Sequence, residues 1–170
     1  KLEITLYKAG DIHKWQVEES ELNNSAHMIL KELDSISIDK IGFRIVHGGE
    51  KYSEPTLLNA NVIADIEQIS SLAPLHNPPA LEKIREFMVL LPQIPKYAVF
   101  DTAFHTTMPA KAYLYGLPYE LYSKYKIRRY GFHGTSHRYI YTELQKLESK
   151  IDRVITCHLG GGASIAAIHN

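Results

Sequence analysis

The sequence predicts an α/β protein. Apolar runs typical of buried strands, at residues 41–46, 97–100 and 154–159, alternate with segments whose apolar residues repeat at helical spacing. Strands and helices that alternate along a chain are the pattern of an α/β fold. With 170 residues, of which 45% are apolar, the chain suffices for one ordinary domain or two small ones with a sizeable core.

The chain carries no formal net charge, because Lys+Arg and Asp+Glu count 19 each. This balance argues against a general nucleic-acid or membrane-surface binder and leaves room for a local basic cleft. The single cysteine, Cys157, excludes an internal disulfide and fits a reducing cytosol. No apolar run approaches the roughly 20 residues of a membrane span, and no signal peptide opens the sequence. We therefore expect a cytoplasmic protein.

In the first half of the chain, apolar periodicity predicts strands and helices in alternation. Alternating apolar residues over 2–6 predict a half-buried strand, and the continuous run 41–46 predicts a buried one. Apolar residues between 22 and 33 fall on one helical face, with Ser20 as the candidate N-cap. A second helix is expected over 62–72.

In the second half, prolines and glycines set the expected boundaries. Three prolines predict a loop over 74–79, and Pro79 is expected to start a helix that runs to about 91. A further helix is expected over 136–149. The runs 154–159 and 163–168, joined by three glycines, predict a hairpin of two strands.

The glycine turn of this hairpin is a candidate anion site. Consecutive glycines at Gly160, Gly161 and Gly162 let backbone N–H groups turn toward one point and approach an anion closely, and phosphate is the natural ligand. The alternative is a tight turn without a ligand, because a glycine motif alone is a weak signal.

Two charged residues stand at predicted strands. Arg44 lies between Phe43 and Ile45 inside an apolar strand, where a guanidinium must find an anion. That anion is either a ligand or an internal partner such as Glu50. Asp101 ends a predicted strand, a common position for a metal-binding or catalytic carboxylate. The alternative is an Asp that caps the following turn.

His133 and His137 are four residues apart, a spacing that invites a zinc interpretation. The glutamate that usually follows the first histidine of such a pair is missing, because position 134 is glycine. The start of a helix at Gly134, Thr135 and Ser136 is the favoured interpretation of this segment.

Taken together, the polar segments are far more specific than any one of them. In their order and spacing they resemble the acetate kinase family of acid kinases, from about Ile41 to the end of the chain. The segments are Phe43–Glu50 (FRIVHGGE), Pro74–Pro79 (PLHNPP), Phe100–His105 (FDTAFH), Arg129–His137 (RYGFHGTSH) and His158–Gly162 (HLGGG).

The resemblance implies an actin-like, ribonuclease-H-like fold of two duplicated α/β domains that face each other across a cleft. Residues 1–104 would form most of the N-terminal domain without its first strands. Residues 105–170 would start the C-terminal domain and end in its phosphate hairpin. The implied reaction is direct in-line transfer between ATP and acetate with Mg²⁺, giving ADP and acetyl phosphate. The implied assembly at full length is a homodimer.

The same resemblance implies roles for the catalytic candidates. Arg44 would bind the acetate carboxylate or the transferring phosphoryl group, and His133 would stabilise the transition state. Asp101 matches the family's essential carboxylate. The nucleophile of the implied reaction is the carboxylate of acetate, which is already ionised at pH 7 and needs no general base. Asp101 is therefore expected to position Mg²⁺ or its water shell and not to transfer a proton.

Binding roles follow in the same way. The residues that would contact ATP phosphates are His158, Leu159, Gly160, Gly161 and Gly162. The residues that would line the pocket for the acetate methyl are Val46, Leu75 and Phe132. His76 matches a further active-site histidine of the family.

The sequence also departs from the family. Many acetate kinases have Asn where this chain has Gly161, and the glycine resembles the hairpin of related butyrate kinases. The family's N-terminal Gly-Ser-Ser phosphate motif, its later arginine, its adenosine pocket and its C-terminal glutamate are not in this sequence. Because the chain opens with Lys1 and stops at Asn170 after an apolar run, we expect an internal piece that is inactive alone. A propionate or butyrate kinase and a non-catalytic truncated binding module are the alternatives.

Overall fold

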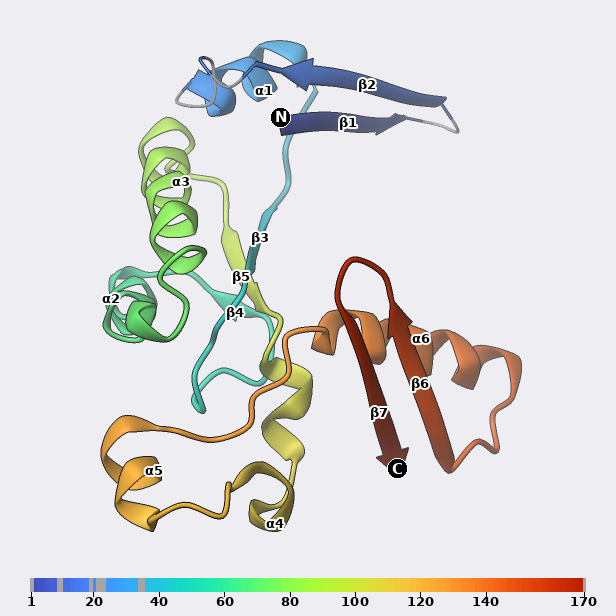
Figure 1. The fold of residues 1–170 in the computed structure, drawn as a ribbon. Helices are drawn as coiled ribbons and strands as arrows, with labels where there is room; N and C mark the ends of the chain where they lie inside the picture. Colours follow the sequence, from blue (N-terminus) through green and yellow to red (C-terminus); the bar gives the residue numbers. More distant parts are fainter. Residues whose placement is uncertain (1, 9–10, 19, 21–23, 34–35, 170) are drawn as a thin grey trace.

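The computed structural model describes residues 2–8, 11–18, 20, 24–33 and 36–169 (Figure 1). Strands and helices alternate along the chain, as an α/β fold requires. The elements in order are β1 (Leu2–Lys8), β2 (Asp11–Val17), α1 (Ser25–Leu33), β3 (Ile41–Ile45), β4 (Thr56–Leu57), α2 (Ala60–Gln68), η2 (Ser70–Leu72), α3 (Asn77–Leu90), β5 (Lys96–Phe100), η3 (Ala103–Thr107), α4 (Ala110–Tyr113), α5 (Tyr119–Tyr125), α6 (Gly134–Leu147), β6 (Arg153–Leu159) and β7 (Ala163–His169).

The central sheet consists of β3, β5 and β4 in that order. β3 and β5 run parallel, whereas the short β4 pairs antiparallel with β5. Helices α2 and α3 lie on one side of this sheet, and their apolar faces form the core with it (Figure 1). The most deeply buried apolar side chains of this core are Ile45, Ile66, Ile84 and Ala98.

The parallel pairing of β3 and β5 fixes where the polar segments meet. Ile45 pairs with Phe100 at the end of both strands, and the Asp101 backbone N–H donates to the Ile45 carbonyl at 2.9 Å. Since parallel strands end at the same edge of a sheet, the residues that follow them gather there.

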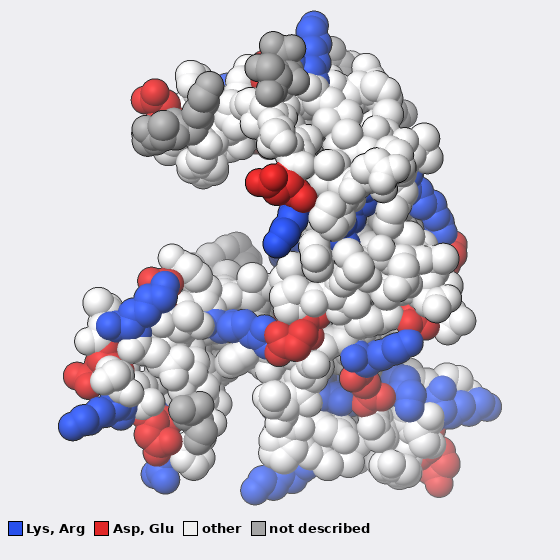
Figure 2. Space-filling model, turned by 180° about the vertical axis from the view of Figure 1, so that it is seen from behind, with Lys and Arg blue, Asp and Glu red and all other residues white. Residues whose placement is uncertain are grey.

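Two antiparallel hairpins complete the chain. β1 and β2 pair from Leu2 and Val17 to Lys8 and Asp11, and β6 and β7 pair over their whole length with α6 packed against β6. Figure 1 shows the two hairpins at different ends of the molecule. On the face seen in Figure 2, positive and negative side chains are interspersed. No helix within the described residues has the length and apolarity needed to cross a membrane.

The expected elements are mostly confirmed, with boundary corrections. The predicted loop over 74–79 is wrong in its second half, because α3 begins at Asn77. Its two prolines occupy the first turn, where their missing N–H groups cost nothing. α6 begins at Gly134 instead of residue 136. Of the predicted helix over 22–33, α1 covers Ser25–Leu33 and Leu22 lies outside the described residues. β2, β4, η3, α4 and α5 were not predicted.

A buried amide locks the loop after β3 to the start of α3. The Asn77 side chain is fully buried, its Oδ1 accepts from the His47 backbone N–H at 3.2 Å, and its Nδ2 donates to the His47 carbonyl at 3.0 Å. The same loop is fixed by the Gly49 N–H, which donates to His47 Nδ1 at 2.9 Å. His47 Nδ1 is therefore an acceptor, and the buried ring is neutral.

Replacement of Asn77 by Ala is expected to lower the free energy of unfolding by about 2–4 kcal/mol, because two buried backbone groups of His47 lose their partners. Asn59→Ala is the matched control, since Asn59 is exposed and caps α2 through one bond to the Val62 N–H. We expect that variant to lose about 1 kcal/mol. Urea unfolding measures both, and equal losses would contradict the account of Asn77.

Acid is expected to destabilise the chain through His47. Burial, and next the charge of Arg128, lower the pKa of His47 to about 4, against a usual value near 6.5. The unfolded state therefore binds the extra proton first, so stability is complete above pH 6.5 and falls as the pH drops to 4. The loss assigned to His47 is about 2–3 kcal/mol.

The measurement is the pH dependence of the unfolding free energy in the wild type and in His47→Asn, whose Oδ1 can replace Nδ1 as the acceptor. A shallower slope between pH 4 and 6.5 is expected in the variant. Some slope will remain, since burial also lowers the pKa of His105 and His137. Identical slopes would refute the assignment to His47.

Candidate active site

Arg44 and Asp101 form an ion pair at the ends of β3 and β5. Arg44 Nε lies 3.0 and 3.1 Å from the two Asp101 carboxylate oxygens, and its Nη2 lies 2.8 Å from Oδ2. Asp101 is 2% exposed, whereas the Arg44 side chain is 73% exposed. The expected alternative pairing of Arg44 with Glu50 is wrong, because its partner is Asp101, which directly follows the neighbouring strand β5. The guanidinium is anchored on one edge and open to solvent on the other.

The start of α6 closes on the same carboxylate. Thr135 Oγ1 donates to Asp101 Oδ1 at 3.3 Å, and the Gly134 N–H donates to the Asp101 carbonyl at 3.1 Å. A Cβ at position 134 would lie 2.3 Å from that carbonyl oxygen, so only glycine allows this approach. The Asp101 side chain thus binds Arg44 and Thr135, a role different from the expected alternative of capping the next turn.

His133 faces the glycine hairpin. Its ring stacks on His158 with centroids 4.0 Å apart, and its Nδ1 lies 2.8 Å from Ser164 Oγ. A Cβ at Gly162 would lie 3.2 Å from His133 Nε2, so this nitrogen adjoins the glycine turn. The structure therefore brings together His133, on the loop before α6, and the predicted phosphate hairpin.

His133 and His137 both turn a nitrogen toward one hydroxyl instead of a shared metal position. Ser164 Oγ lies 2.8 Å from His133 Nδ1 and 2.9 Å from His137 Nε2. Within the part of the chain that the structure describes, no group of three or more His, Cys, Asp or Glu could hold a metal ion.

The glycine turn has the predicted form. Leu159 pairs with Ala163 at the end of the hairpin, and the Gly160 N–H donates to the Gly162 carbonyl at 3.1 Å. Gly161 is exposed and has no heavy atom near its Cβ position, so its backbone is accessible to a ligand. His158 Nδ1 lies 3.0 Å from Ser136 Oγ, which ties β6 to the first turn of α6.

The three residues predicted to line the acetate pocket lie on three different segments. The Phe132 ring packs edge-to-face on His47 at 5.5 Å, and His47 directly follows Val46 in the chain. Leu75 and His76 lie in the exposed turn before α3, and Leu75 is 82% exposed. The structure connects this turn to the site through Asn77, which bonds to His47.

A buried arginine that sequence reasoning did not single out holds the adjacent segment. Arg128 Nη1 lies 2.8 Å from Glu50, its side chain is 6% exposed, and its guanidinium carbon lies 3.6 Å from the Tyr113 ring centroid. Burial opposes ionisation of Glu50, but hydrogen bonds from Arg128 and Tyr122 outweigh it and lower its pKa. This network ties the segment that carries Phe132 and His133 to the loop after β3.

Two small hydroxyl residues, Thr135 and Ser164, also belong to the candidate site, and the sequence analysis assigned them no role. Thr135 and Ser164 stand inside or beside the quoted motifs, but their sequence positions do not show which partners they meet. The signal that could have found them is their place near glycines at predicted element starts: Thr135 directly follows Gly134 at a helix start, and Ser164 lies two residues after Gly162 at a strand start. Side chains of this kind commonly bond to nearby polar groups.

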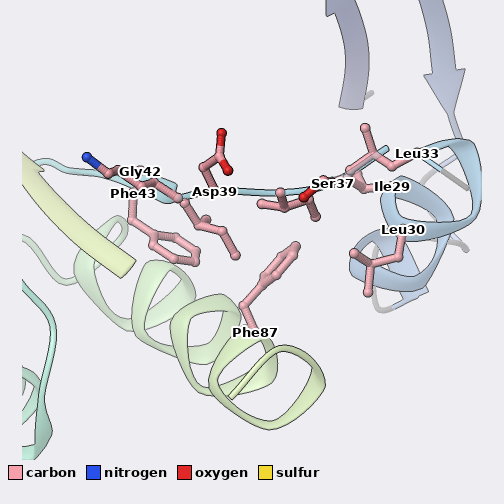
Figure 3. A pocket seen from close by; sticks show the side chains of 11 residues that line it. Ile29, Leu30, Leu33, Ser37, Asp39, Gly42, Phe43 and Phe87 are labelled. Carbon is pink, nitrogen blue, oxygen red and sulfur yellow. The ribbon is translucent and has the colours of Figure 1, made fainter. Parts of the chain in front are cut away.

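A separate apolar cavity of about 840 Å³ lies between α1, β3 and α3. Figure 3 shows Leu30, Leu33, Phe43 and Phe87 around it. Its lining contains none of the predicted site residues. The candidate chemistry is therefore at the carboxyl ends of β3 and β5, not in this cavity.

Comparison with known proteins gives three kinds of match. The model of the Acetokinase family matches residues 6–170. The acetate kinase of Fervidobacterium nodosum is 58% identical over 140 residues, which are 81% of this chain and 34% of that protein. The acetate kinase of Halothermothrix orenii is 55% identical over 150 residues, 86% of this chain and 37% of that protein. This chain thus spans about a third of the length of these relatives.

Solved structures of acetate and propionate kinases also match this chain. The acetate kinase of Porphyromonas gingivalis superposes with a TM-score of 0.84 and 42% identity, over 95% of this chain and 43% of that chain. A propionate kinase from Francisella tularensis superposes with a TM-score of 0.87 and 39% identity, over 98% of this chain and 44% of that chain. These matches confirm the predicted actin-like α/β fold class. The chain belongs to the acetokinase family.

Proposed function

We propose that the full-length protein transfers a phosphoryl group between ATP and acetate, giving ADP and acetyl phosphate. The observation that carries this proposal is the open, anchored guanidinium of Arg44, which shares Asp101 with the start of α6 next to His133 and the glycine hairpin. Relatives that are more than half identical to this chain bear the name acetate kinase, which supports the same reaction.

The proposed chemistry is a direct in-line displacement. A carboxylate oxygen of acetate forms a bond to the γ-phosphorus, the bond to the β–γ bridging oxygen breaks, and ADP leaves with the electron pair. Arg44 binds the acetate carboxylate or the equatorial phosphoryl oxygens, and His133 donates to the charge that develops on them. Both groups are held by the fold before substrate arrives, so their orientation costs little during the reaction.

The nucleotide phosphates are assigned to the glycine turn. Residues His158–Gly162 present backbone groups of an exposed turn beside His133, which suits an anion that needs close backbone approach. Leu159 is 78% exposed, so this side of the turn is open. Gly161 contributes its backbone only, without the side-chain contact of an asparagine.

Magnesium is assigned an indirect place at Asp101. Both oxygens of this buried carboxylate accept hydrogen bonds from Arg44, and Thr135 binds one of them. That arrangement does not fit direct coordination, but it fits an ion held by nucleotide phosphates and its own water shell. When bound there, Mg²⁺ would neutralise charge on the phosphates.

The acceptor is assigned as acetate, with propionate as the second candidate. Val46, Leu75 and Phe132 would line a small apolar pocket beside Arg44. The structural match to a propionate kinase supports the second candidate on the same scaffold. A pocket of this kind rejects larger acids by steric clash, but one methylene changes the binding free energy by only about 1–3 kcal/mol.

We also propose the division into an N-terminal domain over 1–104 and the start of a second over 105–170. In support, α2 and α3 pack with the β3–β5–β4 sheet, whereas α6 packs with the β6–β7 hairpin. The full-length protein is proposed to be a cytoplasmic homodimer that acts without nucleic acid or membrane.

The first test uses the product of the complete reading frame with ADP, Mg²⁺ and acetyl phosphate, and follows ATP by ³¹P NMR. ATP is expected to form, and Arg44→Ala is expected to lower the rate by about 10²–10³-fold. Arg85→Ala is the matched control, because Arg85 forms a surface ion pair with Glu67. The present 170-residue chain is expected to be inactive in the same assay. An inactive full-length protein, or an active Arg44→Ala variant, would overturn the proposal.

Acceptor selectivity tests the pocket. Val46→Ala removes two methyl groups and is expected to raise the kcat/KM of propionate relative to acetate by about 10-fold. Val89→Ala removes the same groups from an exposed position of α3 and should leave the ratio unchanged. If both variants gave the wild-type ratio, Val46 would not line the acceptor pocket.

A further inference from the structure

A chain of hydrogen bonds runs from the β6–β7 hairpin to His133. Thr156 Oγ1 lies 2.7 Å from His137 Nδ1, His137 Nε2 lies 2.9 Å from Ser164 Oγ, and Ser164 Oγ lies 2.8 Å from His133 Nδ1. The two hydroxyls come from adjacent strands of the hairpin, whereas the imidazoles flank the first turn of α6. His137 is 1% exposed and Thr156 is 3% exposed, so water has little access to these bonds.

The number of protons permits only two arrangements when both rings are neutral. A hydroxyl carries one hydrogen, so Ser164 Oγ donates to one histidine and accepts from the other. In the first arrangement Thr156 donates to His137 Nδ1, His137 Nε2–H donates to Ser164, and Ser164 donates to His133 Nδ1. In the second, every one of these bonds is reversed. Burial lowers the pKa of His137, which favours its neutral form.

The two arrangements leave opposite groups on the free nitrogen of His133. In the first, the proton of His133 is on Nε2; in the second, Nε2 carries a lone pair. This nitrogen adjoins Gly162 of the glycine turn, the place assigned to phosphate. Phosphoryl oxygens are acceptors only, so they require an N–H donor there and repel a lone pair. The stack of His133 on His158, with ring centroids 4.0 Å apart, also fixes the orientation of the His133 ring.

We propose that Ser164 is a positioning residue that fixes the proton of neutral His133 on Nε2, with its own donor direction set by His137 and Thr156. This inference rests on the proposed function, because it takes His133 as the donor to the transferring phosphoryl group. Ser164 does not touch the substrate; it turns His133 into a donor and holds its ring beside Gly162.

The test is histidine tautomer assignment by ¹⁵N NMR of the full-length protein, together with kcat and the KM for acetyl phosphate. In the wild type we expect His133 as the Nε2–H form. Ser164→Ala is expected to populate the Nδ1–H form and to lower kcat by about 10- to 100-fold, with KM within about 2-fold. Ser164→Thr keeps the hydroxyl and is expected to restore both the tautomer and kcat.

Thr156→Val can affect His133 only through the hydrogen-bond chain that joins Thr156, His137, Ser164 and His133. The substitution preserves shape in a β-strand and removes the donor to His137 Nδ1, so we expect the Nδ1–H form of His133 to appear there too. Ser136→Ala is the control, since Ser136 bonds to His158 and not to His133. It should leave the His133 tautomer unchanged.

An Nδ1–H form of His133 in the wild type would overturn the proposal. So would an unchanged Nε2–H form in both Ser164→Ala and Thr156→Val, even if kcat fell. If the wild type makes no ATP from acetyl phosphate and ADP, the proposed function fails. The His133 tautomers in the wild type and the variants still decide whether Ser164 and Thr156 fix the His133 proton.

Discussion

An ionised carboxylate that leaves water must be compensated, and the candidate site follows from how Asp101 meets that requirement. Asp101 directly follows β5, accepts hydrogen bonds from Nε and Nη2 of Arg44 on β3, and accepts one from Thr135 at the start of α6. The buried Asp101 carboxylate therefore holds the exposed Arg44 guanidinium and the start of α6 at the same edge of the sheet. Arg44 is fixed toward Asp101 on one edge, and the rest of its guanidinium remains available to an anion.

The second half of the site depends on imidazole and hydroxyl groups instead of charge. His133 stacks on His158, and both rings are held by serines of the opposing element, Ser164 and Ser136. These contacts join the glycine turn to the start of α6, which is already tied to Asp101. The glycine turn is thus linked to the Arg44 guanidinium through α6, whose first turn bonds to both His158 and Asp101.

Sequence patterns predicted the strands and helices that depend on local periodicity. They did not predict side-chain partners that depend on how distant segments pair. The apolar runs at 41–46 and 97–100 correctly predicted β3 and β5, but the partner of Arg44 could not be chosen, because it depends on the register of two parallel strands. The prolines before Ala80 suggested a loop, although a first helical turn also tolerates them. Ser164 was not singled out, because its bonds to two histidines depend on how the hairpin packs on α6.

The most direct test of the central claim is a crystal structure of the full-length protein with ADP, acetate, Mg²⁺ and aluminium fluoride as the phosphoryl mimic. The account predicts the fluoride between acetate and ADP, within hydrogen-bond distance of Arg44 and of His133 Nε2, with the ADP phosphates on residues 158–162. Fluoride bound away from Arg44 and His133, or phosphates away from the glycine turn, would contradict it.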